Sequence, residues 1–252
     1  MIASFDLTGR RALITGAGSP TGIGFTTAML LGQMGASVLI TATTDRVQDR
    51  VAQLRADGID ASGAIADLTH EDQVAALPDE WDVLVNNAGM ISVGGHFEDG
   101  SLTQMSLATW RAGLQRNLDT AFLVSRHVLP AMAARGWGRV VNVASVTGPV
   151  MAMRDDPAYA AAKAGMVGLT RALALDFAGR GVTVNAVAPG WIATGSQTED
   201  EARQGQKTPI GRSADPAEVA AAIAWLCSPG ASYTTGQCIV VDGGNSIAEQ
   251  RA

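Results

Sequence analysis

Short apolar runs alternate with longer stretches of helical periodicity along most of the chain. Most of the short runs are continuously apolar, which is typical of parallel strands that are buried on both faces. They predict strands at Ala12–Thr15, Ser37–Thr41, Ser62–Ala66, Val83–Asn86, Arg139–Val143, Thr183–Ala188 and Cys238–Val241. The longer stretches predict helices at Gly24–Met34, Arg46–Ala56, Glu71–Leu77, Leu107–Ala134, Ala158–Phe177 and Pro216–Cys227.

Local signals at the ends of these segments support the outline. Thr69 with Asp72 resembles a capping box, and Asp215-Pro216 has the pattern of an N-cap followed by a proline in the first helical turn. Gly35 and Gly58 fall where helices are expected to end. Alternation without a Pro/Ser-rich linker predicts one α/β domain over residues 1–252, a doubly wound parallel sheet with helices on both faces.

The charge balance excludes several classes of partner. The chain has 18 Lys and Arg against 24 Asp and Glu, a net charge of −6, and it contains no basic run. Nucleic acid and anionic membranes are therefore not expected partners. No apolar run approaches the roughly 18 residues that span a bilayer, and Met1–Gly9 lacks an apolar signal region. We expect a cytoplasmic protein.

The cysteines and histidines do not form a recognisable metal motif. Cys227 and Cys238 lack CxxC spacing, and two core thiols in a reducing compartment are the expected state. His70, His96 and His127 are scattered without shared spacing. No metal site is expected.

Tyr159 and Lys163 are four residues apart within one predicted helix, so they share a face. A nearby ammonium group favours phenolate and lowers the pKa of a tyrosine from about 10. Such a tyrosine can give or take the proton of a carbonyl/alcohol pair. This spacing is common in helices, and its weight here comes from Ser145 upstream and from a glycine-rich turn near the start of the chain.

The glycine-rich turn runs from Thr15 to Gly24, between the first predicted strand and the first predicted helix. Glycines in such a turn let the backbone approach a pyrophosphate, whose charge is met by the helix N-terminus. The strand–turn–helix context therefore predicts a dinucleotide site.

With these motifs the chain resembles the short-chain dehydrogenase/reductase family over nearly its whole length. The turn is similar to the family's Thr-Gly-x-x-x-Gly-x-Gly but two residues longer, so either Gly16 or Gly18 can take the place of its first glycine. The further matching motifs are Asp67-Leu68, Asn86-Asn87-Ala88-Gly89, Pro189 to Thr194, and Arg212 to Gly244. The resemblance implies a Rossmann-like fold and an oxidoreductase that interconverts a ketone and a secondary alcohol with NAD(P)(H).

The resemblance also implies catalytic roles. Asn117 matches the asparagine that kinks its helix and holds a proton-relay water, and Ser145 matches the serine that hydrogen-bonds the reacting oxygen. Tyr159 matches the general acid/base, and Lys163 the lysine that lowers its pKa and binds the nicotinamide ribose. The residue types alone also allow Asn117 to be a helix irregularity and Ser145 a strand-end cap.

The expected dinucleotide contacts follow from the same motifs. They are Gly16, Gly18, Gly22, Ile23, Gly24, Thr43, Arg46, Asp67, Leu68, Asn87, Gly89, Tyr159, Lys163, Pro189, Gly190, Ile192 and Thr194. Asp67 is also compatible with a turn or helix-cap role, and both roles can hold together. Ala42 stands where an acid would bind a ribose 2′-hydroxyl, and with Thr43 and Arg46 nearby this favours NADP(H) over NAD(H). Asp45 partly offsets Arg46, so NAD(H) remains open.

The substrate pocket is expected from Met90–His96, Val146–Met153 and a mobile lid at about 191–211. Its predicted lining is Ser145, Val146, Met151, Met153, Tyr159 and Trp191. The methionines and the tryptophan suggest room for an apolar or aromatic group. Arg154-Asp155-Asp156 is expected to be a solvated loop, and the alternative is that it attracts a cationic or polyol substrate. The segment 94–101 looks several residues longer than in relatives.

Two other functions and an assembly state are weighed from the same features. The Thr-Ala-Thr pattern after the second strand, with Arg135 and Arg180, resembles 3-oxoacyl-carrier-protein reductases, but a net acidic chain disfavours an acidic carrier protein. A free small-molecule ketone or secondary alcohol ranks first, and a non-catalytic dinucleotide-binding regulator ranks last. The Ala- and Gly-rich helix Ala158–Phe177 and the family resemblance imply a homotetramer, with Leu107–Ala134 at the same interface.

Overall fold

The structure is a computed structural model that describes residues 2–89, 92–93, 96–97 and 100–249. A seven-stranded parallel sheet forms its centre, in the order β3-β2-β1-β4-β7-β8-β9. The strands are β1 (Arg11–Ile14), β2 (Ser37–Ala42), β3 (Ala61–Ile65), β4 (Val83–Asn86), β7 (Gly138–Val143), β8 (Val182–Pro189) and β9 (Cys238–Val241). The expected Rossmann-like sheet is confirmed, with strand ends that differ by at most one or two residues.

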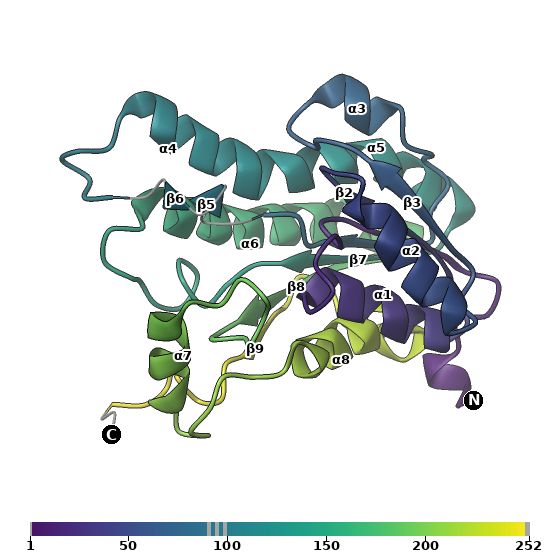
Figure 1. The fold of residues 1–252 in the computed structure, drawn as a ribbon. Helices are drawn as coiled ribbons and strands as arrows, with labels where there is room; N and C mark the ends of the chain where they lie inside the picture. Colours follow the sequence, from purple (N-terminus) through teal and green to yellow (C-terminus); the bar gives the residue numbers. More distant parts are fainter. Residues whose placement is uncertain (1, 90–91, 94–95, 98–99, 250–252) are drawn as a thin grey trace.

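Helices cover both faces of this sheet (Figure 1). On one face lie α1 (Ile23–Gln33), α2 (Arg46–Ala56) and α8 (Pro216–Cys227), and on the other α3 (Glu71–Ala75), α5 (Thr120–Arg135) and α6 (Pro157–Phe177). Short 3-10 turns occur at Ala3–Phe5, Ala178–Arg180 and Pro229–Ala231.

Neighbouring residues of one strand belong to different cores, which explains the continuously apolar runs. Ala12 and Ile14 pack with α1, α2 and α8, whereas Leu13 between them packs with α3 and α5. In β4, Leu84 likewise packs away from Val83 and Val85. Side chains of a strand alternate between its two faces. When both faces are buried, every position therefore favours an apolar residue, and the run is continuous.

Some helix ends follow the expected signals and one does not. Gly35 and Gly58 both follow their helices with positive φ, of 98° and 78°. Asp215 caps α8 in a capping box with Glu218. The capping box expected at Thr69 is wrong, because α3 starts after His70 and the Thr69 hydroxyl donates to Asp67 instead.

The long helix expected at Leu107–Ala134 is interrupted. It consists of α4 (Leu107–Leu114), a π-helical segment at Gln115–Asp119, and α5. The π segment is centred on Asn117, the residue whose family counterpart kinks its helix. A π-bulge inserts one residue into the helical ladder, and such insertions are frequent at functional sites.

Two short elements were not expected from the sequence. A two-stranded antiparallel hairpin joins β5 (Ser92–Val93) to β6 (His96–Phe97), and α7 (Glu199–Gln206) lies within the expected lid. α7 begins with a capping box formed by Thr198 and Glu201. Of the expected pocket wall Met90–His96, residues 90–91 and 94–95 lie outside the described residues. Among the helices that the structure describes, none is both long and apolar enough to cross a membrane.

Candidate active site

The functional site lies where the strand order reverses. β1 lies between β2 and β4, and the helices that follow β1 and β4 cover opposite faces of the sheet, which opens a crevice at the carboxyl ends of these strands. A cavity of about 650 Å³ occupies this region. Its lining includes Gly16, Gly18, Gly22, Ile23, Thr43, Arg46, Asp67, Leu68, Asn87, Gly89 and Thr194. The remaining expected dinucleotide residues lie outside this lining: Gly24, Tyr159, Lys163, Pro189, Gly190 and Ile192.

A network at the end of β1 holds the glycine-rich turn against β4. The Thr15 hydroxyl accepts the backbone N–H groups of Asn87 and Ala88, both at 3.0 Å. The Asn87 side-chain amide donates to the carbonyls of Thr15 and Gly16, also at 3.0 Å. Gly16 has φ of 67°, and a Cβ there would lie 2.7 Å from the Ala88 Cα. Only glycine allows this close approach, which leaves a cradle of the kind that a pyrophosphate requires.

One corner of the cavity carries the residues expected to select the nucleotide. Arg46 is the first residue of α2, and its side chain packs over Gly18. A Cβ added at Gly18 would lie 2.7 Å from Arg46 Nε and 2.9 Å from the Ala42 Cβ. Ala42 and Thr43 line the same cavity. Arg46, Ala42 and Thr43 therefore form one side of the cavity at the end of β2.

Asp67 has the turn role that the sequence left open. Its carboxylate accepts from the Thr69 backbone N–H at 3.0 Å and from the Thr69 hydroxyl at 2.7 Å, and His70 Nδ1 lies 3.4 Å away. Partial burial raises the pKa of Asp67, but the hydrogen bonds from Thr69 and the neighbouring His70 outweigh it and leave the pKa below its ordinary value. Asp67 and Leu68 both line the cavity, so the turn role and a nucleotide contact are compatible.

Lys163 lies almost fully buried on α6. Its Nζ donates to the Val143 carbonyl at 2.8 Å and lies 5.6 Å from the centroid of the Tyr159 ring. Burial lowers the pKa of Lys163 from 10.5 to about 8. Near neutral pH the lysine is therefore still a cation, held at the end of β7 and facing the ring of Tyr159.

Asn117 and Lys163 meet at Gly89. A Cβ added at Gly89 would lie 2.7 Å from Asn117 Oδ1 and 3.4 Å from Lys163 Nζ, and the φ of this glycine is 152°. Asn117 is 1% exposed, and its side-chain amide donates to the Gly113 carbonyl at 3.2 Å. The π-helical segment thus turns a buried amide toward the end of β4 and toward the lysine.

Ser145 follows β7 and is 9% exposed. Its hydroxyl accepts from the Thr147 backbone N–H at 3.1 Å, which fixes the oxygen and leaves its proton to be donated. Ser145 and Tyr159 line a second cavity of about 1090 Å³.

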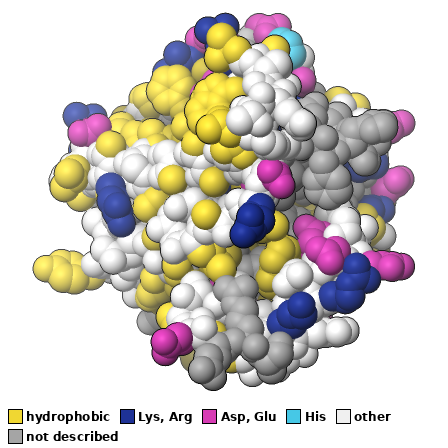
Figure 2. All heavy atoms as spheres, turned by 90° about the vertical axis from the view of Figure 1, so that its left-hand side faces the viewer, with side chains coloured by type: hydrophobic (Ala, Val, Ile, Leu, Met, Phe, Trp, Pro, Cys, Tyr) yellow, Lys and Arg dark blue, Asp and Glu magenta, His cyan; other side chains and the backbone are white. Residues whose placement is uncertain are grey.

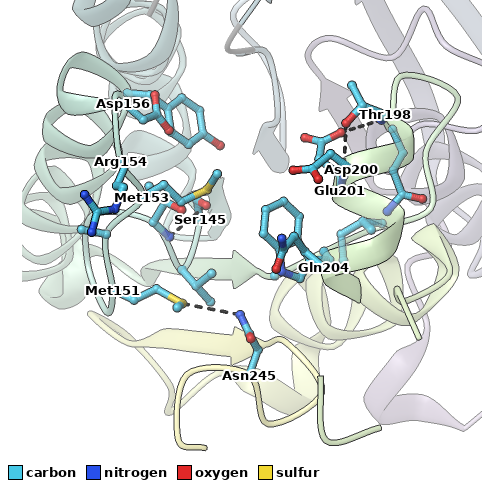
Figure 3. Close-up of a pocket in the computed structure, with 18 of the residues that line it drawn as sticks. Ser145, Met151, Met153, Arg154, Asp156, Thr198, Asp200, Glu201, Gln204 and Asn245 are labelled. Atoms are coloured by element: carbon cyan, nitrogen blue, oxygen red, sulfur yellow. Dashed lines mark hydrogen bonds between the residues drawn. The ribbon is translucent and has the colours of Figure 1, made fainter. Parts of the chain in front are cut away.

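This second cavity has polar walls in addition to the expected apolar lining. Val146, Met151, Met153 and Trp191 line it as expected, together with Gly190 and Ile192. The opposite wall consists of the start of α7 and the C-terminal segment, and Figure 3 shows Thr198, Asp200, Glu201 and Gln204 across from Ser145 and Asp156. Thr194 and Ser196 line both cavities, so the two spaces adjoin at the segment between β8 and α7.

Two lining residues correct or extend the sequence prediction. The solvated loop expected at Arg154-Asp155-Asp156 is wrong in part, because Asp156 is 4% exposed and lines the cavity. Asn245 also lines it, just beyond the motif that ends at Gly244, so motif matching did not reach it. Within the described residues, no group of three or more His, Cys, Asp or Glu side chains is placed to hold a metal ion.

The surface around the cavities is mixed in character. Figure 2 views the molecule from the side that carries α4 and α7 in Figure 1. Hydrophobic side chains gather mainly in the upper part of this face, and acidic and basic side chains are interspersed on it.

Comparisons with known proteins find dehydrogenases and reductases. A family model described as enoyl-(acyl carrier protein) reductase matches residues 16–246. The chain is 40% identical to a cis-4-hydroxycyclohexanecarboxylate dehydrogenase of Sinomonas cyclohexanicum, over 93% of this chain and 96% of that protein.

Two solved structures are similar over nearly their whole length. One is a Beutenbergia cavernae protein assigned as an NAD(P)-dependent gluconate 5-dehydrogenase, with bound NADP at low occupancy; its TM-score is 0.89 at 39% identity, over 97% of this chain and 100% of that one. The other is a 3-oxoacyl-[acyl-carrier protein] reductase of Brucella melitensis with bound NAD; its TM-score is 0.88 at 33% identity, over 98% of this chain and 94% of that one.

Proposed function

The chain belongs to the short-chain dehydrogenase/reductase family, and from that premise we propose that it is an NAD(P)(H)-dependent oxidoreductase that interconverts a ketone and a secondary alcohol. One observation carries the proposal. The Lys163 ammonium faces the Tyr159 ring on α6, and Tyr159 lines a cavity together with Ser145 that adjoins the cavity at the switch point of the sheet.

The residues present fit a dinucleotide. Gly16 and Gly89 leave space where a Cβ would clash, and Asp67, Leu68, Thr43 and Arg46 line the same cavity. A bound nicotinamide would supply or accept the hydride. We infer that Gly16, Gly18 and Gly22 hold the pyrophosphate and that Lys163 and Asn87 hold the nucleoside nearest the reacting carbon.

The chain's own residues would handle the proton and the charge. In reduction Tyr159 gives its hydroxyl proton to the oxygen of the carbonyl, and Ser145 donates a hydrogen bond to that oxygen as its negative charge grows. In oxidation Tyr159 takes the proton of the alcohol, and the Lys163 ammonium stabilises the phenolate that this step needs. Asn117 holds the π-helical segment and supplies a polar group beside Lys163 for proton relay.

Replacing Tyr159 tests this assignment, and the chain offers a matched control. Its other tyrosine, Tyr233, is fully exposed. We expect Tyr159→Phe to lower the kcat for a panel of cyclic ketones and alcohols by at least about 100-fold, the lower range for loss of a general acid. Turnover is followed by the absorbance of reduced nicotinamide. Tyr233→Phe should retain wild-type turnover, and near wild-type turnover in Tyr159→Phe would contradict the assignment.

NADP(H) is the proposed cofactor over NAD(H). The support is Arg46 across Gly18 and the absence of an acid at Ala42. The two similar structures carry NADP in one case and NAD in the other, so they do not discriminate. Titration with both reduced nucleotides, followed by their fluorescence, measures the preference directly.

A 3-oxoacyl-carrier-protein reductase is the second candidate. The Brucella melitensis structure carries this name, whereas the family model is named for a different reductase of acyl-carrier-protein substrates. Arg135, one of the two arginines considered for carrier docking, donates instead to the Trp81 carbonyl and lies 3.9 Å from Asp82. This internal engagement and the net charge of −6 leave the free ketone or alcohol as the preferred substrate class. A non-catalytic regulator ranks last, because the cavity lined by Tyr159 and Ser145 would then have no catalytic role.

A homotetramer in the cytoplasm completes the proposal. Leu107, Phe122 and Leu175 are exposed on α4, α5 and α6, the helices expected at one interface. Both cysteines are free thiols, which suits a reducing compartment. Sedimentation velocity tests the assembly, and a monomer at micromolar concentration would contradict it.

A further inference from the structure

The turn that follows β9 is rigidly built. One oxygen of the Asp242 carboxylate accepts the backbone N–H of Gly244 at 2.9 Å, and the other accepts that of Ser246 at 2.6 Å. The Asp242 carbonyl accepts the backbone N–H of Asn245 at 3.2 Å. These three bonds hold the backbone from which the Asn245 side chain extends.

That side chain is directed into the substrate cavity. Asn245 is 4% exposed and lines the cavity of about 1090 Å³ together with Ser145 and Tyr159. Figure 3 shows it at the far end of the cavity from Asp156, with its amide pointing toward Met151. In the same view Ser145 lies between Asp156 and Asn245.

The contact that Asn245 makes across the cavity is a poor one for an amide. Its Nδ2 donates to the Met151 sulfur at 3.6 Å, and a thioether is a weak acceptor. A buried amide gains more from an oxygen partner than from sulfur. A substrate oxygen at this end of the cavity would therefore compete well for the same N–H group.

The opposite side of this contact is also fixed. Met151 donates its backbone N–H to the Val146 carbonyl at 2.9 Å, and its own carbonyl accepts from Gly148 at 2.7 Å. Because the backbone on both sides is held, the amide is preorganised and little conformational entropy is lost on binding.

The charges around the cavity indicate what kind of oxygen fits. Asp155, Asp156, Asp200 and Glu201 line it, against the guanidinium of Arg154. This excess of carboxylates disfavours a negatively charged substrate group. A hydroxyl group suits the site, because it is neutral and its oxygen can accept the Nδ2 hydrogen that Asn245 now gives to the Met151 sulfur.

We propose that Asn245 is a specificity-determining residue that hydrogen-bonds a second, neutral oxygen of the substrate, remote from the reacting carbon. The substrate class is then a small secondary alcohol that carries a further hydroxyl group, with its hydrocarbon part against Val146, Met151 and Trp191. This inference rests on the proposed function and deepens it, since it names the substrate class of the same site.

The experiment compares three substrates on three proteins. Cyclohexanol, cyclohexane-1,4-diol and 4-hydroxycyclohexanecarboxylate are oxidised by the wild type, Asn245→Leu and Ser246→Ala. Leucine keeps the branched shape of asparagine without its polar atoms. Ser246 follows Asn245 in the same turn and lies outside the cavity lining, so it is the matched control.

We expect the wild type to favour the diol over cyclohexanol in kcat/KM, and Asn245→Leu to lower that ratio about 10- to 100-fold, the range for an unmet buried hydrogen bond. Ser246→Ala should keep the wild-type ratio. A merely structural role for Asn245 would lower kcat/KM for both alcohols alike, and that result overturns the proposal. A wild-type preference for 4-hydroxycyclohexanecarboxylate over the diol overturns the neutral substrate class.

A binding measurement separates failure of this inference from failure of the proposed function. The affinity of the diol for the complex of enzyme and reduced nicotinamide is measured by fluorescence for the wild type and Asn245→Leu. If no alcohol is oxidised and no matching ketone reduced, the proposed function fails while this measurement still decides the role of Asn245. Weaker diol binding by Asn245→Leu supports the inference, and equal or undetectable binding overturns it.

Discussion

Replacing Lys163 with methionine should separate what this lysine does for activity from what it does to stability. Burial lowers the pKa of Lys163 from 10.5 to about 8. Below about pH 8 the folded protein holds a buried ammonium, and the cost of removing that charge from water is fully present. As the pH rises from about 8 to 10.5 the folded protein loses the proton while the unfolded chain keeps it, so the stability of the wild type increases with pH.

The size of this effect follows from the shift. A difference of about 2.5 pKa units at about 1.4 kcal/mol per unit corresponds to about 3 kcal/mol. Lys163→Met lacks the titrating group, so the stability of the wild type relative to this variant should increase by about 3 kcal/mol across that pH range. The variant also loses the hydrogen bond from Nζ to the Val143 carbonyl. Both the charged and the neutral amine can donate this bond, so its loss lowers the stability by a similar amount at low and at high pH.

Urea unfolding, followed by the fluorescence of the five tryptophans, measures the free energy of unfolding at about pH 7 and about pH 10. The chain's other lysine, Lys207, is exposed and supplies the control Lys207→Met. Parallel stability profiles for the wild type and Lys163→Met would refute the reasoning, because they would mean that Lys163 titrates alike in the folded and unfolded chain. Lys163→Met should also lose most turnover.

Two further substitutions test the cofactor side of the site. Ala42→Asp places a carboxylate beside Gly18 and Arg46, and we expect the ratio of NADPH to NADH affinity to fall about tenfold, or about 1.4 kcal/mol; an unchanged ratio would place the 2′ group elsewhere. Gly89→Ala introduces a Cβ 2.7 Å from Asn117 Oδ1 at a φ of 152°, so turnover should fall at least about tenfold because Asn117 and Lys163 are displaced. Gly179→Ala, where a Cβ meets nothing within 4 Å, should retain activity, and equal activity in both variants would speak against the Gly89 contact.

The burial of the strands on both faces was predictable from the pattern of apolar residues along the chain. Ala12 to Ile14 are apolar without interruption, which is the pattern of a strand that is covered on both faces. Gly35, Gly58 and Asp215 mark helix ends through their own backbone and capping preferences. Thr69, like Asp215, is a residue type that commonly caps a helix. Its hydroxyl donates to Asp67 instead, because the side chains of such residues can bond to several local partners.

Other features have no periodic signal. The π-helical segment around Asn117 changes the hydrogen-bond ladder without changing the apolar pattern, so the suggestion of an irregularity came from Asn117 itself and from the family resemblance. The hairpin of Ser92–Val93 with His96–Phe97 is too short for a period of two to be visible. The capping box of Thr198 and Glu201 was readable, and it could have revealed α7 inside the expected lid.

The candidate site divides in the same way. Tyr159, Lys163, Ser145 and Asn117 belong to motifs, and their positions in sequence were enough to single them out. Asp156 was assigned to solvent because it follows two charged residues, whereas the structure buries it at the start of α6. Whether a charged residue at a helix start is buried depends on what the rest of the chain packs against it, which no local pattern records.

Thr194 and Ser196 form part of the walls of both cavities. An occupant of one cavity therefore changes a surface that the other occupant touches. Linkage then requires reciprocity: whatever factor the dinucleotide applies to the affinity for the alcohol, the alcohol applies to the affinity for the dinucleotide. Because Thr194 and Ser196 form this shared wall between β8 and α7, we expect the affinity measured for one cavity to depend on the occupant of the other.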